Sequence, residues 1–205
     1  MKPFTTLTAL PAPLLLDNID TDTIIPSREM KSTGKTGLAD GLFAPWRYRT
    51  PGGRDPDPDF VLNRPDHADA QILLGGGNFG CGSSREHAVW ALAEYGIRAI
   101  IAPGFAPIFA SNCTRNGIVP VTLDRATIEE IAASHAPVTI DLAAQTVRQE
   151  GGACWPFDIG AEAKAMLLEG LDAIDLTLKN RAEIAAFQQA DRASRPWIYL
   201  GDIGQ

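Results

Sequence analysis

The chain has 205 residues, of which 45% are hydrophobic and 21% are charged, and its formal net charge is -7. This length and apolar content suffice for one domain with a large core, with or without a small appendage. The acidic balance argues against a nucleic-acid partner, because binding to a phosphate backbone requires a clustered basic face.

The amino-terminal residues mix Thr and Pro with apolar side chains and lack the charged region and apolar core of a signal peptide. No stretch approaches the apolar length that a membrane span requires. We therefore expect a cytoplasmic protein that does not bind a membrane.

The first hundred residues begin with strand patterns and continue with irregular segments. Residues 4–10 alternate and residues 14–16 are apolar, which favours a hairpin or paired strands. Residues 17–26 predict a polar turn, since Asp and Thr side chains bond to nearby backbone. Residues 27–37 are typical of a mobile loop or a solvated connector, and the Pro- and Gly-rich residues 41–64 of an excursion over the surface.

The most informative stretch is residues 72–92. Apolar residues 72–74 predict a buried strand, a glycine-dense loop follows, and the apolar periodicity after it predicts a helix. Ser83 and Glu86 have the spacing of a capping box, so we expect the helix to begin there with its unpaired N–H groups facing the loop. Ser84 and Arg85 complete a group of donors suited to a carboxylate.

A plainer explanation of the same residues stays open. The glycines can form a tight turn, with Ser83 acting only as a cap and Arg85 pairing with a surface acid. Two phosphate-binding patterns are not supported: the loop lacks the P-loop lysine, and residues 75–80 match G-x-G-x-x-G without an acid at the ribose-binding distance. The nucleophile elbow G-x-S-x-G is also missing.

The rest of the chain predicts an α/β fold with a mixed sheet and flanking helices. Strands are expected at residues 98–102 and 119–123, a helix between them at residues 105–113, and a hairpin at residues 138–149. Capping residues are expected at the starts of three later helices: Thr127 with Glu130, Asp158, and Asn180 with Glu183.

The cysteines and histidines do not form a metal-binding pattern. Cys81, Cys113 and Cys154 are far apart and include no C-x-x-C pair, so reduced thiols are expected rather than disulfides. An iron–sulfur cluster usually has a closely spaced pair of ligands, which is missing. The three histidines include no pair four residues apart. We therefore expect no metal in this chain.

Residues 78–88, Asn-Phe-Gly-Cys-Gly-Ser-Ser-Arg-Glu-His-Ala, resemble the signature of the swivelling domain of the aconitase superfamily. The similarity is closest to the small-subunit family of 3-isopropylmalate dehydratase, or isopropylmalate isomerase. Residues 17–26, 102–109 and 116–121 agree with this family in the expected order, and residues 170–178 resemble the tail of its bacterial form. The resemblance implies a single swivelling β/β/α domain over residues 1–205, with a C-terminal helical extension from near Asp158.

The resemblance also implies a function. It is that of a hydro-lyase subunit which interconverts 2-isopropylmalate and 3-isopropylmalate by dehydration and rehydration in leucine biosynthesis. Such a subunit is active only with a separate large subunit that carries a 4Fe-4S cluster. By the same resemblance Ser83 is the base, Ser84 and Arg85 bind the substrate carboxylate, and Asp22 and Thr23 support them.

Substrate choice is assigned by the resemblance to residues 27–37. An isopropyl group requires apolar contacts, for which Ile24, Ile25 and Met30 are the candidates, and Lys31 lies in the same loop. Sister hydro-lyases that act on citraconate and methylmalate, or on homoaconitate, share the motif and differ in this loop. A non-catalytic carboxylate-binding module is the alternative from another class.

Overall fold

The computed structural model describes residues 1–31, 34–149 and 151–199. The chain divides into two compact units, Met1–Gly170 and Leu171–Gln205. Helix α6 (Ala161–Glu169) belongs to the first unit, where Met166 and Leu167 are buried. The helical extension that the sequence placed from near Asp158 therefore has its first helix inside this unit.

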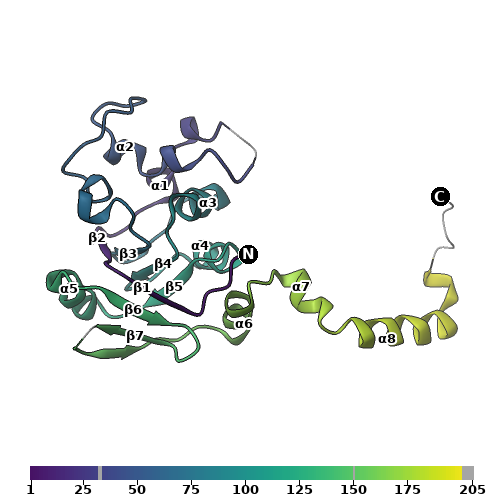
Figure 1. Cartoon of the computed structure of the whole chain (residues 1–205). Helices are drawn as coiled ribbons and strands as arrows, with labels where there is room; N and C mark the ends of the chain where they lie inside the picture. The colour runs from purple at the N-terminus through teal and green to yellow at the C-terminus, as the bar shows by residue number, and fades with distance from the viewer. Residues whose placement is uncertain (32–33, 150, 200–205) are drawn as a thin grey trace. The chain divides into compact units, whose positions relative to one another are not determined.

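A parallel sheet forms the centre of the first unit (Figure 1). Its strands, in the order in which they pair, are β2 (Ala12–Leu14), β3 (Ile72–Gly75), β4 (Ala99–Ala102) and β5 (Val119–Thr122). All residues of β3 and β4 are buried, which explains their continuous apolar sequences, because central parallel strands are covered on both faces. The predicted pairing of these two strands is confirmed, with Leu73 opposite Ile100.

The second sheet is antiparallel, and its strands are β1 (Thr6–Ala9), β6 (Val138–Asp141), β7 (Thr146–Gln149) and β8 (Cys154–Pro156). The predicted hairpin is confirmed as β6 and β7, with Ile140 opposite Val147. The predicted pairing of the first two strands is wrong: β1 pairs with β6 and β2 pairs with β3. The two residues between β1 and β2 carry the chain from one sheet to the other, so the strands cannot fold back on each other.

The remaining helices of the first unit are α1 (Thr21–Ile24), α2 (Ala44–Arg47), α3 (Glu86–Tyr95), α4 (Pro107–Arg115) and α5 (Arg125–Ser134). Short 3-10 helices are η1 (Ser27–Glu29), η2 (Ala39–Gly41), η3 (Val61–Asn63) and η4 (Pro65–His67). The surface excursion expected at residues 41–64 therefore contains short helical turns, and Trp46 stacks on the buried Phe43 ring.

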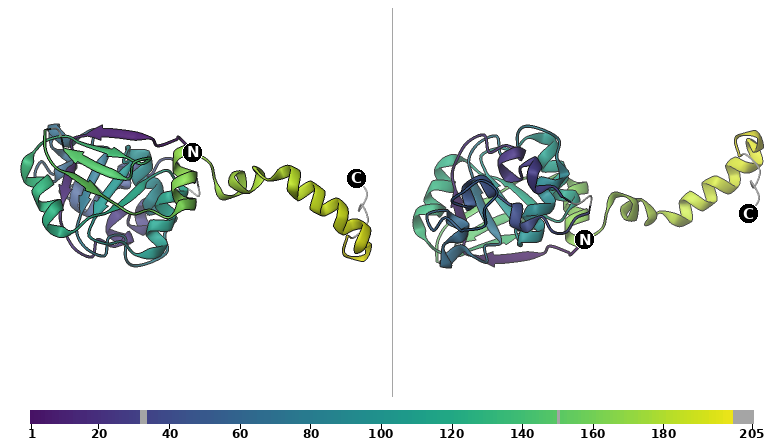
Figure 2. Two further views of the ribbon diagram at one scale, coloured as in Figure 1. Left: turned by 90° about the horizontal axis from the view of Figure 1, so that it is seen from below. Right: turned by 90° about the horizontal axis from the view of Figure 1, so that it is seen from above.

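The first unit has three layers. Leu73 packs in one core with residues of α1, α3 and α4, whereas its neighbours Ile72 and Leu74 pack in a second core with the antiparallel sheet. Successive side chains of a strand point to opposite faces, so the parallel sheet is the middle layer. Figure 2 looks onto the antiparallel sheet from below and onto the helical side from above. The predicted β/β/α class is confirmed, with the strands divided between two sheets.

The predicted starts of α5 and α6 need correction. The cap of α5 is Asp124, which accepts a hydrogen bond from the Thr127 amide at 2.9 Å, so the expected capping box of Thr127 and Glu130 is wrong. Helix α6 follows Gly160 without a side-chain cap, and Asp158 does not cap it. Its predicted end is confirmed at Gly170, which has the left-handed conformation typical of a glycine C-cap.

The second unit contains α7 (Ala173–Leu178), α8 (Arg181–Ser194) and the 3-10 helix η5 (Pro196–Ile198). Asn180 precedes α8 but makes no side-chain cap bond, so its predicted capping is wrong. Asp191 accepts a hydrogen bond from Tyr199 Oη at 2.7 Å and also binds Arg195. Over the described part of the chain, none of the helices combines the length and the apolar character of a membrane span.

Candidate functional site

The loop after β3 extends the parallel sheet beyond its carboxyl edge. On one side the Gly80 amide donates to the Ile19 carbonyl at 2.7 Å, and the Thr21 amide donates to the Cys81 carbonyl at 2.9 Å. On the other side, Phe79 exchanges two 2.9 Å bonds with the segment after β4, donating to Gly104 and accepting from Ala106. Three loops at adjacent strand ends are thus joined, at the edge where ligands bind in open α/β sheets.

Two glycines allow this arrangement. Gly80 has φ of 76°, and a Cβ atom built on it would lie 2.1 Å from the Phe109 ring. Gly76 passes so close to the preceding loop that a Cβ atom there would lie 2.3 Å from the Leu16 carbonyl oxygen. Any larger residue at these positions would push the loop away from its neighbours, because a Cβ atom needs more space than either contact leaves.

A pocket of about 90 Å³ lies where the loop meets α1 and α4. Ser83, Ser84 and Arg85 line one side, and Thr21 of α1 also lines it. The first turn of α4, with Ile108 and Phe109, forms an apolar wall. The two serines are exposed, so their hydroxyl groups are accessible to a small molecule.

Arg85, which lines the pocket, forms an ion pair with Asp22, which does not line it. The Arg85 side chain is 22% exposed and that of Asp22 is 55% exposed, so the guanidinium is the more enclosed partner. Thr21 Oγ1 donates to the Ser83 carbonyl at 2.9 Å and fixes the backbone of the serine. The structure therefore brings together Asp22, Ser83, Ser84 and Arg85, which the sequence had assigned to one site.

Thr23 lies on the same short helix but does not line the pocket. Its amide donates to Asp20 Oδ1 at 2.6 Å, and this bond caps α1. Because α1 carries both Thr21 and Asp22, the cap supports the site through the position of the helix.

The predicted capping box at Ser83 is wrong. Helix α3 begins at Glu86, and Arg85 occupies the N-cap position without a side-chain cap bond. Glu86 Oε1 instead accepts a 2.9 Å hydrogen bond from Asn116 Nδ2. Ser83 lies two residues before the N-cap, and its carbonyl accepts hydrogen bonds from Thr21 Oγ1 and from the Arg85 amide.

The helix start that lines the pocket belongs to α4. It begins with Pro107, so the amides of Ile108 and Phe109 have no partner inside the helix, and no side chain caps them. Sequence reasoning placed a helix here but did not connect it with the site. The Ala-Pro pair at residues 106–107 was the available signal, because proline is favoured at the first helical position.

The four residues that the sequence assigned to substrate choice lie outside the pocket. Ile24 and Ile25 are fully buried in the core and Met30 is partly buried against it, while Lys31 is exposed. None of these four lines the pocket. Part of the predicted loop, residues 32–33, lies outside the described residues.

The cysteines show no shared role. Cys81 is half-buried, Cys113 is buried, and Cys154 is exposed. Burial strongly raises the pKa of the Cys113 thiol, which keeps it protonated. Among the described residues, no three His, Cys, Asp or Glu side chains gather as possible metal ligands.

Asp17 ties the glycine loop to α5. Its carboxylate accepts a hydrogen bond from the Gly77 amide at 2.6 Å and pairs with Arg125. The amide bond, followed by the Arg125 guanidinium, lowers the pKa of Asp17, so the carboxylate stays charged at neutral pH.

The pocket has the chemistry of a carboxylate site. A guanidinium, two hydroxyl groups and the amides at the start of α4 are donors that favour an anion, and charge-assisted hydrogen bonds are the strong ones. The three-layer fold with such a site at the sheet edge defines an aconitase-type domain. The aconitase C-terminal domain model matches residues 1–126, and the LeuD_N model matches residues 128–161.

The similarity extends over the whole chain. The chain is 58% identical to the 3-isopropylmalate dehydratase small subunit of Cupriavidus necator, with 98% of this chain and 99% of the relative covered. It is 46% identical to the small subunit of Paramagnetospirillum magneticum, covering 97% of this chain and 100% of the relative. A model for the C-terminal domain of the 3-isopropylmalate dehydratase small subunit matches residues 174–199. The chain belongs to the 3-isopropylmalate dehydratase small-subunit family.

A solved structure agrees with this assignment. The crystal structure of 3-isopropylmalate dehydratase (leuD) from Methanocaldococcus jannaschii superposes with a TM-score of 0.64 at 26% sequence identity. The match covers 89% of this chain and 99% of the other. The shared fold therefore includes most of the described structure.

Gly80→Ala tests the close approach at the glycine loop. Gly52→Ala is the matched control, because its φ of 77° is nearly the same while a Cβ atom there would have no neighbour within 4 Å. Both changes place an alanine in the left-handed conformation, but only Gly80→Ala also overlaps the Phe109 ring. We therefore expect Gly80→Ala to lower the free energy of unfolding by about 2 kcal/mol more than Gly52→Ala does. The free energy of unfolding in urea measures the difference; equal losses would contradict the assigned contact.

Proposed function

We propose that this chain is the small subunit of a hydro-lyase that interconverts 2-isopropylmalate and 3-isopropylmalate in leucine biosynthesis. The observation that carries the proposal is the pocket formed by Ser83, Ser84 and Arg85, in a chain whose full-length relatives are named 3-isopropylmalate dehydratase small subunit. A small subunit requires a large-subunit partner, and the proposed site is completed by that partner. The proposed setting is the cytoplasm, where a small polar acid is available without transport.

The donors of the pocket bind and orient a substrate carboxylate. Arg85 supplies two parallel N–H groups, and Ser84 adds a hydroxyl beside them. Asp22 holds the guanidinium at the edge of the pocket through the ion pair. An exposed ion pair adds little stability, so its proposed value lies in fixing the orientation of Arg85.

Ser83 is the proposed base. Ser83 Oγ, after losing its own proton to solvent, takes the proton from the carbon next to the bound carboxylate. The electron pair of that C–H bond forms the alkene, and the hydroxyl leaves the neighbouring carbon as hydroxide, which is held on the large-subunit side of the proposed site. Rehydration then transfers the proton from Ser83 to the carbon that lost the hydroxyl. The hydroxyl adds to the carbon that lost the proton. Arg85 and the free amides of α4 lower the cost of the negative oxygen, since fixed donors stabilise charge where it develops.

The side chains of this chain do not fit a 4Fe-4S cluster, which needs several thiolates close together. Cys113 is buried with a raised pKa and Cys154 is exposed, and over the described residues no ligand group forms. We therefore assign the cluster to the large subunit and derive no step of this chain through it.

Assays of the purified pair of subunits test the substrate. We expect turnover of 2-isopropylmalate to exceed that of 2-methylmalate and of homoaconitate, because the family relatives carry the isopropylmalate name. A preference for either of the other acids would overturn the substrate assignment. Failure of the chain to purify with any large subunit would favour a carboxylate-binding module instead.

Ser83→Ala should lower kcat by about 100- to 10,000-fold, the range expected for loss of a positioned base. The matched variant Ser84→Ala should mainly raise KM, because the neighbouring hydroxyl is assigned to binding. Steady-state kinetics separate the two effects, and co-purification with the large subunit shows whether each variant still assembles. Near-normal kcat for Ser83→Ala would show that another group takes the proton.

Arg85→Lys should lower kcat/KM by about 10- to 100-fold, since an ammonium group keeps the charge but cannot form two parallel bonds to a carboxylate. Arg49→Lys is the control, because the Arg49 guanidinium lies in an exposed 3.6 Å pair with Asp55 and does not line the pocket. The ratio of kcat/KM between the two variants measures how much the planar guanidinium of Arg85, with its two parallel N–H groups, contributes to activity. Equal activity would show that Arg85 acts by charge alone.

A further inference from the structure

The α4 side of the pocket beside Ser83 carries a polar side chain that the sequence did not single out. Asn112 lines this pocket together with Ile108, which lies one helical turn before it on the same face of α4. Asn112 is half-buried. Its side-chain amide can donate two hydrogen bonds and accept two, and polar groups that are withdrawn from solvent usually have partners.

The core-facing residues of α4 fix which of its side chains border the pocket. Phe109 and Cys113 are four residues apart and both are buried, and the centroid of the Phe109 ring lies 5.6 Å from that of Phe79 in the glycine loop. The Phe79 carbonyl also accepts a 2.9 Å hydrogen bond from the Ala106 amide, directly before the helix. Because these contacts hold the helix in place, the face that carries Asn112 has a fixed position along the pocket.

The side-chain amide of Asn112 has no hydrogen-bond partner within the described part of the chain. The backbone carbonyl of Asn112 accepts two bonds from Asn116, one from its amide at 3.1 Å and one from its Nδ2 at 2.9 Å, but the side chain of Asn112 makes none. The side chain of Asn116 differs, because it also binds Glu86 at 2.9 Å and Trp90 at 3.1 Å. The fold therefore uses the amide group of Asn116, whereas that of Asn112 is available to a ligand.

The pocket is small enough that a bound group would contact this side chain. Its volume is about 90 Å³, and both Asn112 and the pair Ser84 and Arg85 line it. A carboxylate has two oxygens with about four acceptor positions, which point in different directions. A carboxylate that lies against Ser84 and Arg85 would fill most of this space and reach the α4 wall, so one of its acceptor positions would face Asn112.

The charge balance beside the pocket increases the importance of neutral donors. Asp22 is paired with Arg85 Nη1, so part of the guanidinium charge is already compensated. Ser83 is the proposed base and is needed for the proton. The donors that remain for an anion are the rest of the Arg85 guanidinium, the Ser84 hydroxyl, the first amides of α4 and Asn112 Nδ2. Of the side chains in this group, Asn112 is the one on α4, opposite the glycine loop.

We propose that Asn112 is a further substrate-binding residue, whose Nδ2 donates a hydrogen bond to the carboxylate held by Ser84 and Arg85. The inference rests on the proposed function, which places that carboxylate in the pocket. Two N–H groups of Arg85, the Ser84 hydroxyl and the Asn112 amide then occupy the acceptor positions of the carboxylate. The carboxylate is present in the substrate and throughout the reaction, so loss of this bond should weaken binding more than it slows the chemical step.

Asn112→Leu in the complex with the large subunit tests the bond. Leucine has nearly the volume of asparagine but no donor, so KM should rise about 10- to 100-fold with kcat nearly unchanged, the range expected for loss of a hydrogen bond to a charged group. The melting temperature and co-purification with the large subunit should stay native. A native KM would overturn the inference. Loss of the large subunit would also overturn it, because Asn112 would then be an interface residue.

Asn112→Asp keeps the shape of the side chain and gives a readout that a structural role would not change. At about pH 8 the new carboxylate repels that of the substrate, so KM should exceed the value for Asn112→Leu. Protonation turns this carboxyl group into a donor, and the neighbouring like charge raises its pKa, so the excess in KM should shrink as the pH is lowered toward about 6. Asn180→Asp, at an exposed helix start outside the pocket, is the matched control and should keep the native KM at each pH. A KM for Asn112→Asp that matches the native value at every pH would contradict the assigned bond.

The proposed function can fail separately. If the native complex prefers another hydroxy acid, the assignment to 2-isopropylmalate falls, and the same variants are measured with the preferred acid, because every candidate carries the carboxylate. If the chain forms no complex, NMR of the 15N-labelled full-length chain decides: titration with 2-isopropylmalate should shift the side-chain amide signals of Asn112, identified by their loss in Asn112→Leu, but not those of Asn180. Unshifted Asn112 signals would overturn the inference. If the native complex turns over 2-isopropylmalate and both Asn112 variants keep its KM, only the role of Asn112 falls.

Discussion

The backbone bonds that Phe79, Gly80 and Cys81 make with the two neighbouring loops are the constraint on which the rest of the site depends. They continue the parallel pattern of the sheet past the ends of β2, β3 and β4, so the loop has a fixed direction when it reaches Ser83. The close packing of Gly80 on Phe109 then brings the start of α4 to the same place. Because backbone hydrogen bonds set these positions, the loop itself places the exposed Ser83 and Ser84, whereas Arg85 is also paired with Asp22.

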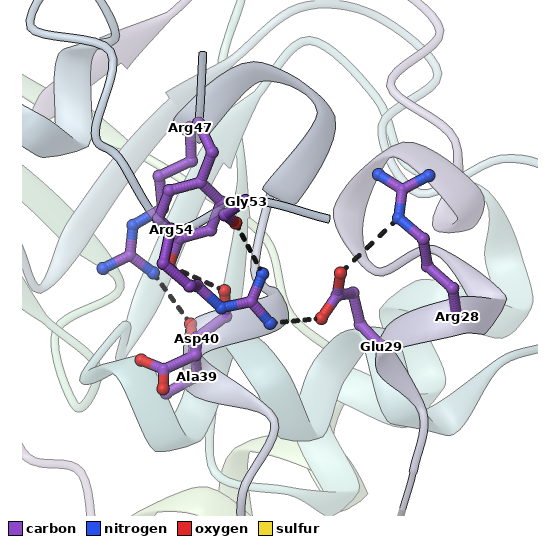
Figure 3. A network of polar contacts seen from close by, with 8 residues as sticks. Arg28, Glu29, Ala39, Asp40, Arg47, Gly53 and Arg54 are labelled. Atoms are coloured by element: carbon purple, nitrogen blue, oxygen red, sulfur yellow. Dashed lines mark hydrogen bonds and ion pairs between the residues drawn. The ribbon is translucent and has the colours of Figure 1, made fainter. Parts of the chain in front are cut away.

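The polar contacts of the molecule differ in what they contribute. The Asp22–Arg85 pair is partly exposed and screened by solvent, so it orients a side chain more than it stabilises the fold. Glu29 is buried, and removal of Arg54 would leave its charge with the longer 3.5 Å pair to Arg28 (Figure 3). Glu94 is exposed, yet it accepts hydrogen bonds from three successive amides, those of residues 37–39. The first contact thus depends on a desolvated charge and the second on directional hydrogen bonds.

The sequence predicted the features that depend on local pattern. Apolar runs identified β3 and β4, and the glycine-rich motif identified the residues that surround the pocket. It failed where distant segments compete with local preference: Ser83 has capping spacing, but Thr21 binds its carbonyl. Ile24 and Ile25, which the sequence offered as substrate contacts, are buried in the core and do not line the pocket. The pairing of β1 with β6 could not be predicted either, because alternation does not specify a partner strand.

The size of the pocket supports the proposal that a second polypeptide completes the site. Ligand pockets usually have volumes of about 300 to 1,000 Å³, whereas the pocket beside Ser83 has about 90 Å³. That space accepts a carboxylate and its neighbouring carbon, and it leaves the rest of a branched hydroxy acid outside. On the function proposed above, a chain that binds only one end of its substrate does not exclude water from the reacting carbons. The remaining walls of the proposed site would then come from the large subunit, which agrees with membership of the 3-isopropylmalate dehydratase small-subunit family.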